Sequence, residues 1–117
     1  MIVNNTFDGG GISCGGSGIY EKLFEANIFN NSSALPTTAG CTYRYNLITP
    51  TMSVTGTGNF TGAPMFRAPT TGDFHLTAGS AAIDADLDPT IPNGHDRDGV
   101  SRPQGTHSDV GAFEYVP

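Results

Sequence analysis

An asparagine recurs along the first half of the chain, each time two residues before a large apolar side chain. The three copies are Asn5-Thr6-Phe7, Asn27-Ile28-Phe29 and Asn46-Leu47-Ile48, which places the asparagines 22 and 19 residues apart. Intervals of about 20 residues are typical of one turn of a β-solenoid. Stacked turns bring equivalent positions to about 4.8 Å, so each asparagine can hydrogen-bond to the next while its apolar neighbour points inward. The alternative is that asparagine is simply common in turns.

Short strand-like runs alternate with clusters of turn residues between these asparagines. Glycine clusters at 8–11, 14–18 and 55–58 separate runs that are rich in aromatic and β-branched residues. With 16 glycines, 8 prolines and only 14% charged residues, the 117-residue chain is expected to form one all-β domain. Residues 20–26 are the only stretch that resembles a helical turn, and we interpret them as strand and turn.

The second half of the chain carries an ordered series of motifs. They are Gly72-Asp73-Phe74, Gly79-Ser80-Ala81-Ala82-Ile83-Asp84, Asp96-Arg97-Asp98-Gly99, Arg102-Pro103 and Asp109-Val110-Gly111-Ala112-Phe113-Glu114-Tyr115. In this order they resemble the C-terminal portion of secreted bacterial right-handed parallel β-helix proteins, the pectate-lyase-like and choice-of-anchor proteins. One position departs from the pattern, since Ala63 stands where relatives usually have an aspartate. The resemblance is specific as to fold and says almost nothing about activity.

Together, the repeat and the resemblance imply a short right-handed single-stranded parallel β-helix. About three coils are expected over residues 1–62, followed by an irregular C-terminal cap over residues 63–117, within a single domain. Apolar residues of the tail alternate with polar ones and are expected to cover the last coil. These are Phe74, Leu76, Ile83, Val110 and Phe113. The resemblance also implies an extracellular or cell-surface location, although the first ten residues lack the basic stretch and apolar core of a signal peptide.

The N-terminal end of this expected β-helix has no cap, because strand-like sequence begins at Ile2. An uncapped end exposes unpaired backbone groups and apolar rings, which favours pairing with another chain. Homo-oligomerisation through this end is one hypothesis, and a truncated longer protein is the competing one.

The net charge of −6 is confined to residues 73–117, where eight acidic residues face only Arg97 and Arg102. An acidic tail repels nucleic-acid phosphates and anionic membrane surfaces, so we expect no nucleic-acid partner. No apolar run approaches the ~18 residues of a membrane span. The two cysteines, Cys14 and Cys41, are 27 residues apart, and their spacing leaves open whether they bridge neighbouring coils or remain buried thiols.

No cofactor is expected from the sequence, and calcium is the candidate that remains, because the tail offers several carboxylates on loop-like sequence. They are Asp84, Asp86, Asp88, Asp96 and Asp98. The pattern fails as an EF-hand, since Pro89 occupies the glycine position and His95 the position of the bidentate glutamate. The alternative is that these aspartates cap turns, pair with arginine or face solvent. The three histidines, His75, His95 and His107, have spacings that match no compact metal site.

Arg44 between Tyr43 and Tyr45 is the surface cluster most suited to touch a sugar, through aromatic stacking and hydrogen-bond donation. The alternative is a structural strand with an outward arginine and inward tyrosines. The leading functional hypothesis is a non-catalytic structural or cell-surface module that is carbohydrate-associated and self-assembling. Many relatives of the fold are polysaccharide lyases and hydrolases, so such an enzyme, or a fragment of one, is the alternative.

Overall fold

The computed structural model describes residues 1–14, 21–36, 40–88, 90–91 and 94–117. In these residues the chain is all-β, and its one helical element is a single 3-10 turn, η1 (Pro69–Thr71). Six strands form two three-stranded parallel sheets. Two further strands, β7 (Phe66–Ala68) and β8 (Asp73–Leu76), form an antiparallel hairpin. The all-β, parallel-sheet prediction is therefore confirmed.

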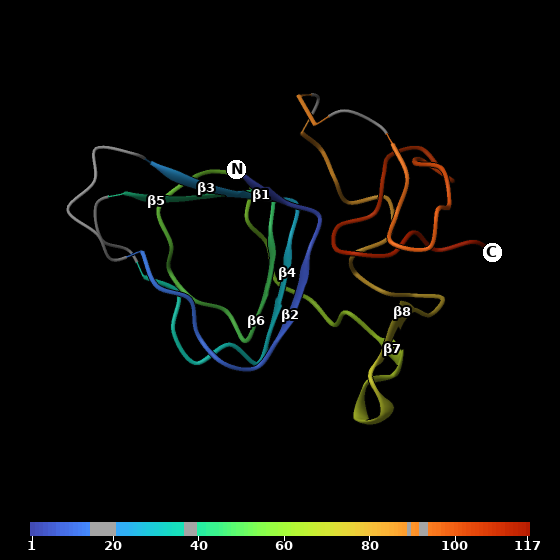
Figure 1. The fold of residues 1–117 in the computed structure, drawn as a ribbon, viewed down its shortest axis with the longest axis horizontal. Coiled ribbons are helices and arrows are strands. Elements are labelled where there is room, and N and C mark those ends of the chain that lie inside the picture. The colour runs from blue at the N-terminus through green and yellow to red at the C-terminus, as the bar shows by residue number, and fades with distance from the viewer. Residues whose placement is uncertain (15–20, 37–39, 89, 92–93) are drawn as a thin grey trace.

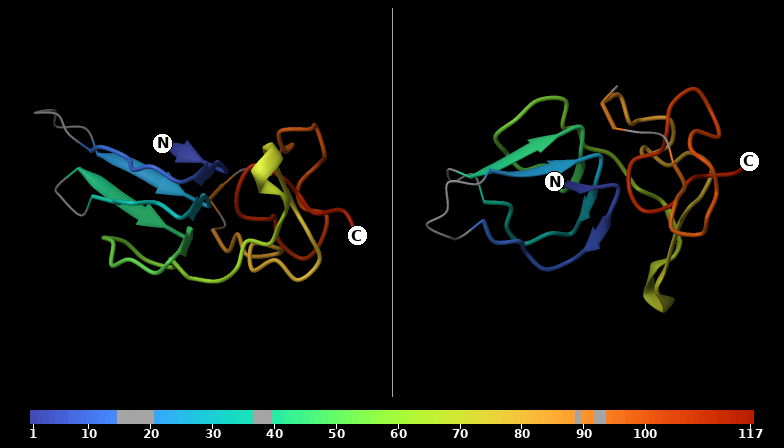
Figure 2. Two further views of the ribbon diagram at one scale, coloured as in Figure 1. Left: turned by 90° about the horizontal axis from the view of Figure 1, so that it is seen from below. Right: turned by 45° about the horizontal axis from the view of Figure 1, so that its top comes forward.

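The chain passes three times from the first parallel sheet to the second, and the three passes lie on one another as a parallel stack (Figures 1 and 2). The first sheet has the order β1-β3-β5 and the second the order β2-β4-β6. The strands of the three passes are β1 (Ile2–Val3) and β2 (Thr6–Asp8), β3 (Lys22–Glu25) and β4 (Ile28–Asn30), and β5 (Cys41–Arg44) and β6 (Leu47–Thr49). Within residues 20–26, the described part contains strand β3, as predicted, and Tyr20 lies outside the described residues.

The register of the second sheet matches the repeat read from the sequence. Phe7 pairs with Phe29, and Phe29 pairs with Ile48. The preceding asparagines stack as a ladder: the backbone N–H of Asn5 donates to the Oδ1 of Asn27 at 2.9 Å, and that of Asn27 donates to the Oδ1 of Asn46 at 2.9 Å. The stacked-asparagine interpretation is therefore confirmed.

A fourth asparagine, Asn59, extends the ladder beyond the third pass. Its Oδ1 accepts from the backbone N–H of Asn46 at 3.1 Å, and its amide donates to the carbonyl of Tyr43 at 2.7 Å. The surrounding segment, 55–60, runs along the third pass, where Tyr43 donates to the carbonyl of Thr55 and Ile48 to that of Phe60, each at 2.8 Å. The strands of the third pass are thus hydrogen-bonded on both sides.

A left-handed residue precedes each of the first three ladder asparagines and turns the chain from one sheet to the other. These residues are Asn4, Ala26 and Tyr45, with φ of 55°, 51° and 54°. Asparagine adopts this conformation with less strain than most residues, whereas alanine and tyrosine need support from their surroundings. The stack supplies that support, because Ala26 N–H donates to the carbonyl of Arg44 and Ala26 is fully buried.

The inside of the stack is an apolar core built from aromatic rings that repeat from pass to pass. Phe7 stacks on Phe29 with ring centroids 4.9 Å apart, and Phe24 stacks on Tyr43 at 5.2 Å. The two stacked pairs meet edge-on, since Phe24 and Phe29 lie 6.0 Å apart in a T-shaped contact. Offset and edge-to-face contacts of this kind stabilise by about 0.5–1.5 kcal/mol beyond area burial.

The tail packs beside the stack, against the outer face of the second sheet (Figure 1). Ile28 and Leu47 point away from the inner core and form a second buried cluster with Leu76, Ala82 and Val110. Backbone bonds add to this contact, because Gly111 N–H donates to the carbonyl of Ala26 at 2.9 Å and Ala112 N–H donates to the Oγ1 of Thr6 at 3.1 Å. The expectation that the tail covers the last coil is therefore wrong: it lies alongside all three passes.

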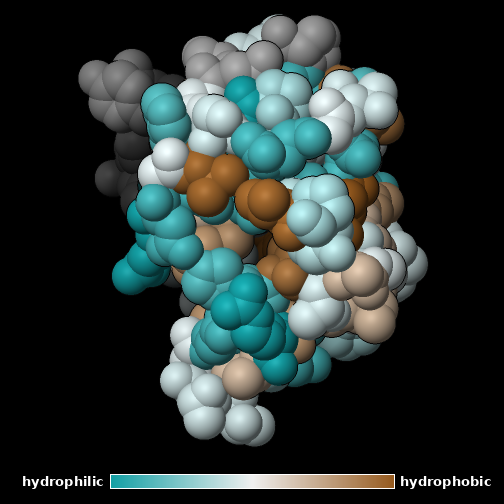
Figure 3. Space-filling model, turned by 90° about the vertical axis from the view of Figure 1, so that its right-hand side faces the viewer, coloured by the Kyte–Doolittle hydropathy of each residue, from teal (hydrophilic) through white to brown (hydrophobic). Residues whose placement is uncertain are grey.

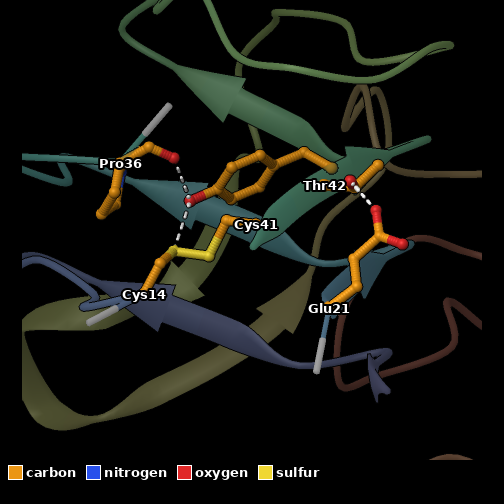
Figure 4. The surroundings of a disulfide bond; sticks show 6 residues. Cys14, Glu21, Pro36, Cys41 and Thr42 are labelled. Atoms are coloured by element: carbon orange, nitrogen blue, oxygen red, sulfur yellow. Dashed lines mark hydrogen bonds between the residues drawn. A yellow bond between two sulfur atoms is a disulfide. The ribbon is translucent and has the colours of Figure 1, made fainter. Parts of the chain in front are cut away.

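A disulfide joins Cys14, at the end of the first pass, to Cys41 at the start of β5, with a Cα–Cα distance of 5.8 Å (Figure 4). This settles the question that the cysteine spacing leaves open. The hydroxyl of Tyr43 lies next to the bridge, 3.9 Å from the Sγ of Cys14, and donates to the carbonyl of Pro36 at 3.1 Å. On the outside, the Thr42 hydroxyl donates to the Glu21 carboxylate. In the part of the chain that is described, no helix is long and apolar enough to span a membrane.

Candidate functional site

Arg44 and Asp88, which the sequence placed in two different candidate sites, form one ion-pair cluster with Glu25. Arg44 ends β5 and Glu25 ends β3, and the parallel register sets them side by side. The Nε of Arg44 donates to Glu25 at 2.5 Å, and its Nη2 lies 3.3 Å from the Oδ2 of Asp88. Because Glu25 is 1% exposed and Asp88 7%, the two carboxylates would be costly to bury without this arginine.

The pKa values of this cluster favour the ionised pair. The hydrogen bond to Glu25 raises the pKa of Arg44 above its ordinary value. Burial raises the pKa of Asp88, but hydrogen bonds from the Thr90 hydroxyl and backbone and the charge of Arg44 outweigh it, so the net shift is downward. Burial raises the pKa of the neighbouring Asp86. Arg44, Glu25 and Asp88 therefore form a charged connection between the stack and the tail.

The predicted sugar surface of Tyr43, Arg44 and Tyr45 does not exist as a set of three outward side chains. Tyr43 is fully buried in the inner core, so the prediction for this residue is corrected. The alternation of a strand places Tyr43 inward and Arg44 outward, where Arg44 pairs with Glu25. Tyr45 lies half-buried over Gly58, where a Cβ would come within 2.4 Å of the tyrosine ring.

The five aspartates proposed for calcium do not converge, and most of them cap backbone turns. Asp84 accepts from the backbone N–H of His107 at 3.0 Å, and Asp86 accepts from that of Asp88 at 3.1 Å. Asp96 accepts from three backbone N–H groups, those of Asp98, Val100 and Glu114. Among the described residues, no three histidine, cysteine, aspartate or glutamate side chains gather as metal ligands. The calcium site stays a prediction without a converging ligand set.

Sequence reasoning missed a cluster around His75 on the tail. Its Nδ1 lies 2.5 Å from Asp73 and its Nε2 lies 2.7 Å from Asp98, while the ring stacks on Phe113 at 4.0 Å. Hydrogen bonds to Asp98 and Asp73 raise the pKa of His75. The hydrogen bond between His75 and Asp73 also lowers the pKa of Asp73. An imidazolium that donates from both nitrogens has no lone pair to accept a proton, so it is unsuited to act as a general base.

His75 also lines a pocket of about 430 Å³ on the tail. Leu76, Val100 and Val116 supply apolar side chains, and Arg67, Asp96 and Glu114 supply ionisable ones. Figure 3, which faces this side of the molecule, shows apolar side chains gathered between polar ones. Each of the three ionisable groups already has a partner, since Arg67 pairs with Asp73 at 3.5 Å and Asp96 and Glu114 accept backbone hydrogen bonds.

Three deeply buried ionisable residues of the tail belong to its last motifs. Arg102, with 3% of its side chain exposed, donates to the carbonyls of Asp109 and Gly111 at 2.6 and 2.7 Å and pairs with Glu114 at 3.2 Å. Asp109 accepts from the backbone of Asp84 and Tyr115, yet burial raises its pKa to about 6. The Arg-Pro and Asp-Val-Gly-Ala motifs thus hold an irregular segment in one conformation.

Comparison with family models and with curated proteins gave no match for this chain. In the described residues, the buried carboxylates of Glu25, Asp88 and Glu114 are each engaged by an arginine. Removing one partner of such a pair would leave a buried charge uncompensated, so these arginines and carboxylates depend on one another.

Proposed function

We propose that this chain is a non-catalytic structural module, a short right-handed parallel β-helix of about three coils that assembles through its first-pass edge. The observation that carries the proposal is the asymmetry between the two ends of the stack. At one end, segment 55–60 is hydrogen-bonded to the third pass. At the other end, β1 and β2 are edge strands of their sheets. An edge strand presents unpaired N–H and C=O groups that template pairing with another chain.

The two ends of the asparagine ladder also differ from each other. In the inner rungs, Asn27 and Asn46, the Oδ1 accepts hydrogen bonds from both the backbone N–H and the side-chain amide of the preceding asparagine in the ladder. The ladder stops at Asn5, which is exposed and whose Oδ1 accepts no hydrogen bond from the described residues. Phe7 is covered on one ring face by Phe29 and is only partly buried. A strand laid on this edge would therefore gain backbone bonds and cover an aromatic ring.

A second copy of this chain is the occupant that the charges favour. Residues 1–72 have balanced charges, and the whole surplus of −6 lies in residues 73–117. The strands that would meet edge to edge belong to the neutral half, so the paired strands themselves carry no surplus charge that repels a second copy. A two-fold axis perpendicular to β2 at this edge pairs β2 with its own copy in antiparallel orientation and closes the assembly as a dimer.

An extracellular or cell-surface location, with carbohydrate association, completes the proposal. The Cys14–Cys41 disulfide supports an oxidising compartment, since such bonds persist mainly outside the cytosol. The order of tail motifs supports a secreted β-helix ancestry. The carbohydrate part rests on that resemblance alone, because the buried Tyr43 removes one aromatic from the sugar surface first expected.

The mass of the chain in solution, measured by light scattering on a size-exclusion column, tests self-assembly. We expect a discrete dimer for the native chain. Because Gly9 N–H donates toward β4, the N–H of the preceding Asp8 faces the open edge. Asp8→Pro removes that donor and should give monomers, whereas Asp8→Asn keeps it and should still dimerise. A native chain that remains monomeric across a hundredfold concentration range would overturn the proposal.

A further inference from the structure

A small pocket of about 190 Å³ lies within the tail, and we call it the tail pocket. Its lining comes from two segments: Asp86, Asp88 and Ile91 from the first, and Pro103, Thr106 and His107 from the second. The segments are held side by side by the bond from Asp86 N–H to the carbonyl of Ser108 at 3.0 Å. Pockets for drug-sized molecules begin at about 300 Å³, so this one fits a group of about the size of a single side chain.

Asp86 is buried, yet one of its carboxylate oxygens opens into this pocket. The residue is 7% exposed, and its Oδ1 accepts from the backbone N–H of Asp88 at 3.1 Å. Its Oδ2 has no hydrogen-bond partner among the described residues. In that part of the chain, the unpaired side-chain atoms that are closed to solvent are the Oδ1 of Asn4 and the Nε of Arg102 alone. The Oδ2 of Asp86 is therefore open, and the tail pocket that Asp86 lines is the opening.

The negative charge around Asp86 exceeds the positive charge that compensates it. Burial is the main cause that raises the pKa of Asp86, and the carboxylates of Asp88 and Glu25 add to it, while the charge of Arg102 opposes it in part. Arg44 forms ion pairs with Glu25 and Asp88. Three buried carboxylates thus share the direct contact of one arginine. A further cation beside Asp86 would offset the cost of burying its charge.

We propose that the tail pocket binds a primary alkylammonium group, either the end of a lysine side chain or a small free amine. The ammonium donates to the Oδ2 of Asp86, and its short alkyl chain packs against Ile91 and Pro103. An ammonium is a compact charge with three donors, which suits a small pocket with one open carboxylate oxygen, whereas a guanidinium is a planar fork that matches two oxygens. Calcium takes six to eight oxygen ligands, and no three acidic, histidine or cysteine side chains gather as ligands in the described residues.

An NMR titration of the full chain with three matched probes tests this proposal. The probes are n-butylammonium, butan-1-ol, which has no charge, and tetramethylammonium, which has no N–H donor, all at pH 7.5 and equal ionic strength. We expect saturable one-to-one shifts of the Asp86 and His107 amide signals with n-butylammonium, and at least tenfold weaker binding of the other two probes. No saturable shift with n-butylammonium, or equal binding of all three probes, overturns the proposal.

A fourth probe, lysine with its amino and carboxyl ends blocked as amides, separates the two sources of the ammonium. Binding comparable to that of n-butylammonium identifies a lysine side chain as an occupant that the tail pocket accepts. Binding of n-butylammonium alone identifies a free amine as the ligand, because the backbone of a lysine then cannot approach closely enough.

A variant of Asp86 with a matched control locates the binding in the tail pocket. Asp86→Asn keeps an oxygen for the Asp88 N–H but removes the charge, and it should weaken n-butylammonium binding at least tenfold. Asp84→Asn should change it less than twofold, because Asp84 caps the N–H of His107 without lining the pocket. Asparagine also tolerates the positive φ of 54° at that position. Binding that survives Asp86→Asn, or that is lost equally in both variants, contradicts the proposal.

Discussion

The Oδ1 of Asn46 accepts two hydrogen bonds from Asn27, one from the backbone N–H at 2.9 Å and one from the side-chain amide at 3.1 Å. Its own amide donates to the carbonyl of Phe24 at 2.9 Å. Both asparagines are fully buried, so none of these groups has water as an alternative. The Asn46 side chain thus satisfies polar groups on both sides of the turn in the neighbouring pass, at Phe24 and Asn27. This links the sequence repeat directly to the stability of the stack.

Replacing an inner rung of this ladder should destabilise the protein far more than replacing its end. Asn46→Ala leaves the buried N–H of Asn27 and the carbonyl of Phe24 unpaired, which should cost about 3–5 kcal/mol of unfolding free energy. Asn5→Ala removes an exposed side chain, which should cost less than about 1 kcal/mol. Urea unfolding followed by circular dichroism measures both. Similar losses for the two variants would contradict the ladder as a source of stability.

The disulfide should contribute stability mainly by restricting the unfolded chain. The bridge closes a loop of 27 residues. The loop-entropy relation gives about 3.5 kcal/mol for such a loop. The double substitution Cys14→Ser with Cys41→Ser, and the native chain in reducing agent, should both lose about this amount in urea unfolding. If reduction leaves the unfolding midpoint unchanged, the bridge makes no net contribution.

Gly111 fixes how closely the tail approaches the second sheet. A Cβ at this position would meet the Cδ1 of Ile28 at 2.6 Å and the Oγ1 of Thr6 at 2.9 Å, and the residue has φ of 99°. Gly111→Ala should therefore push the tail from the sheet and cost about 3 kcal/mol or more. Gly99→Ala is the matched control, because Gly99 also has a positive φ, 86°, but open space around it. It should cost only about 1 kcal/mol, for the backbone alone.

Equal losses for these two glycine variants, measured by thermal unfolding, would mean that backbone strain explains both and that the tail contact is loose. A larger loss for Gly111→Ala should be accompanied by exposure of Leu47 and Val110, which hydrogen exchange can follow. The contrast between the two variants separates packing from conformation.

The repeat was predictable from the sequence because a parallel register places equivalent residues side by side. The spacing of the asparagines therefore predicts directly that Phe7, Phe29 and Ile48 pair with one another across neighbouring strands. The side of the stack on which the tail packs was also encoded, although less obviously. Ile28-Phe29 and Leu47-Ile48 are consecutive apolar pairs, and in a strand this pattern indicates a sheet buried on both faces. The inner face is covered by the core and the outer face by the tail.

The candidate site was less predictable, because its partners come from segments without regular structure. The sequence singled out Arg44 and Asp88 separately, but they are 44 residues apart and no periodicity relates them. The alternation of β8 puts Asp73 and His75 on one face, which is visible in the sequence, whereas the position of Asp98 depends on the path of the irregular loop. The position of Arg97, which lines a pocket together with Asn4 and Arg102, depends on that same loop path.

Stability should fall as the pH rises from about 4 to about 7, because of Asp109. Its folded pKa, about 6, lies above the ordinary value of 3.8, since burial disfavours the charged form. A group with a raised folded pKa contributes stability that is present below its unfolded pKa and is lost as the pH rises through its folded pKa. His75 acts in the same direction at higher pH, because its pKa is also raised, by Asp98 and Asp73.

Urea unfolding at intervals from pH 4 to pH 9 should therefore show the greatest stability on the acidic side. Asp98→Asn removes the larger of the two carboxylate contributions to His75 and should flatten the decline above pH 6.5 while leaving the decline below pH 6 in place. The titration of the His75 ring, followed by NMR, should shift to lower pH in the same variant. A stability that rises between pH 4 and pH 7 would show that Asp109 is ionised in the fold, with its two backbone donors outweighing its burial.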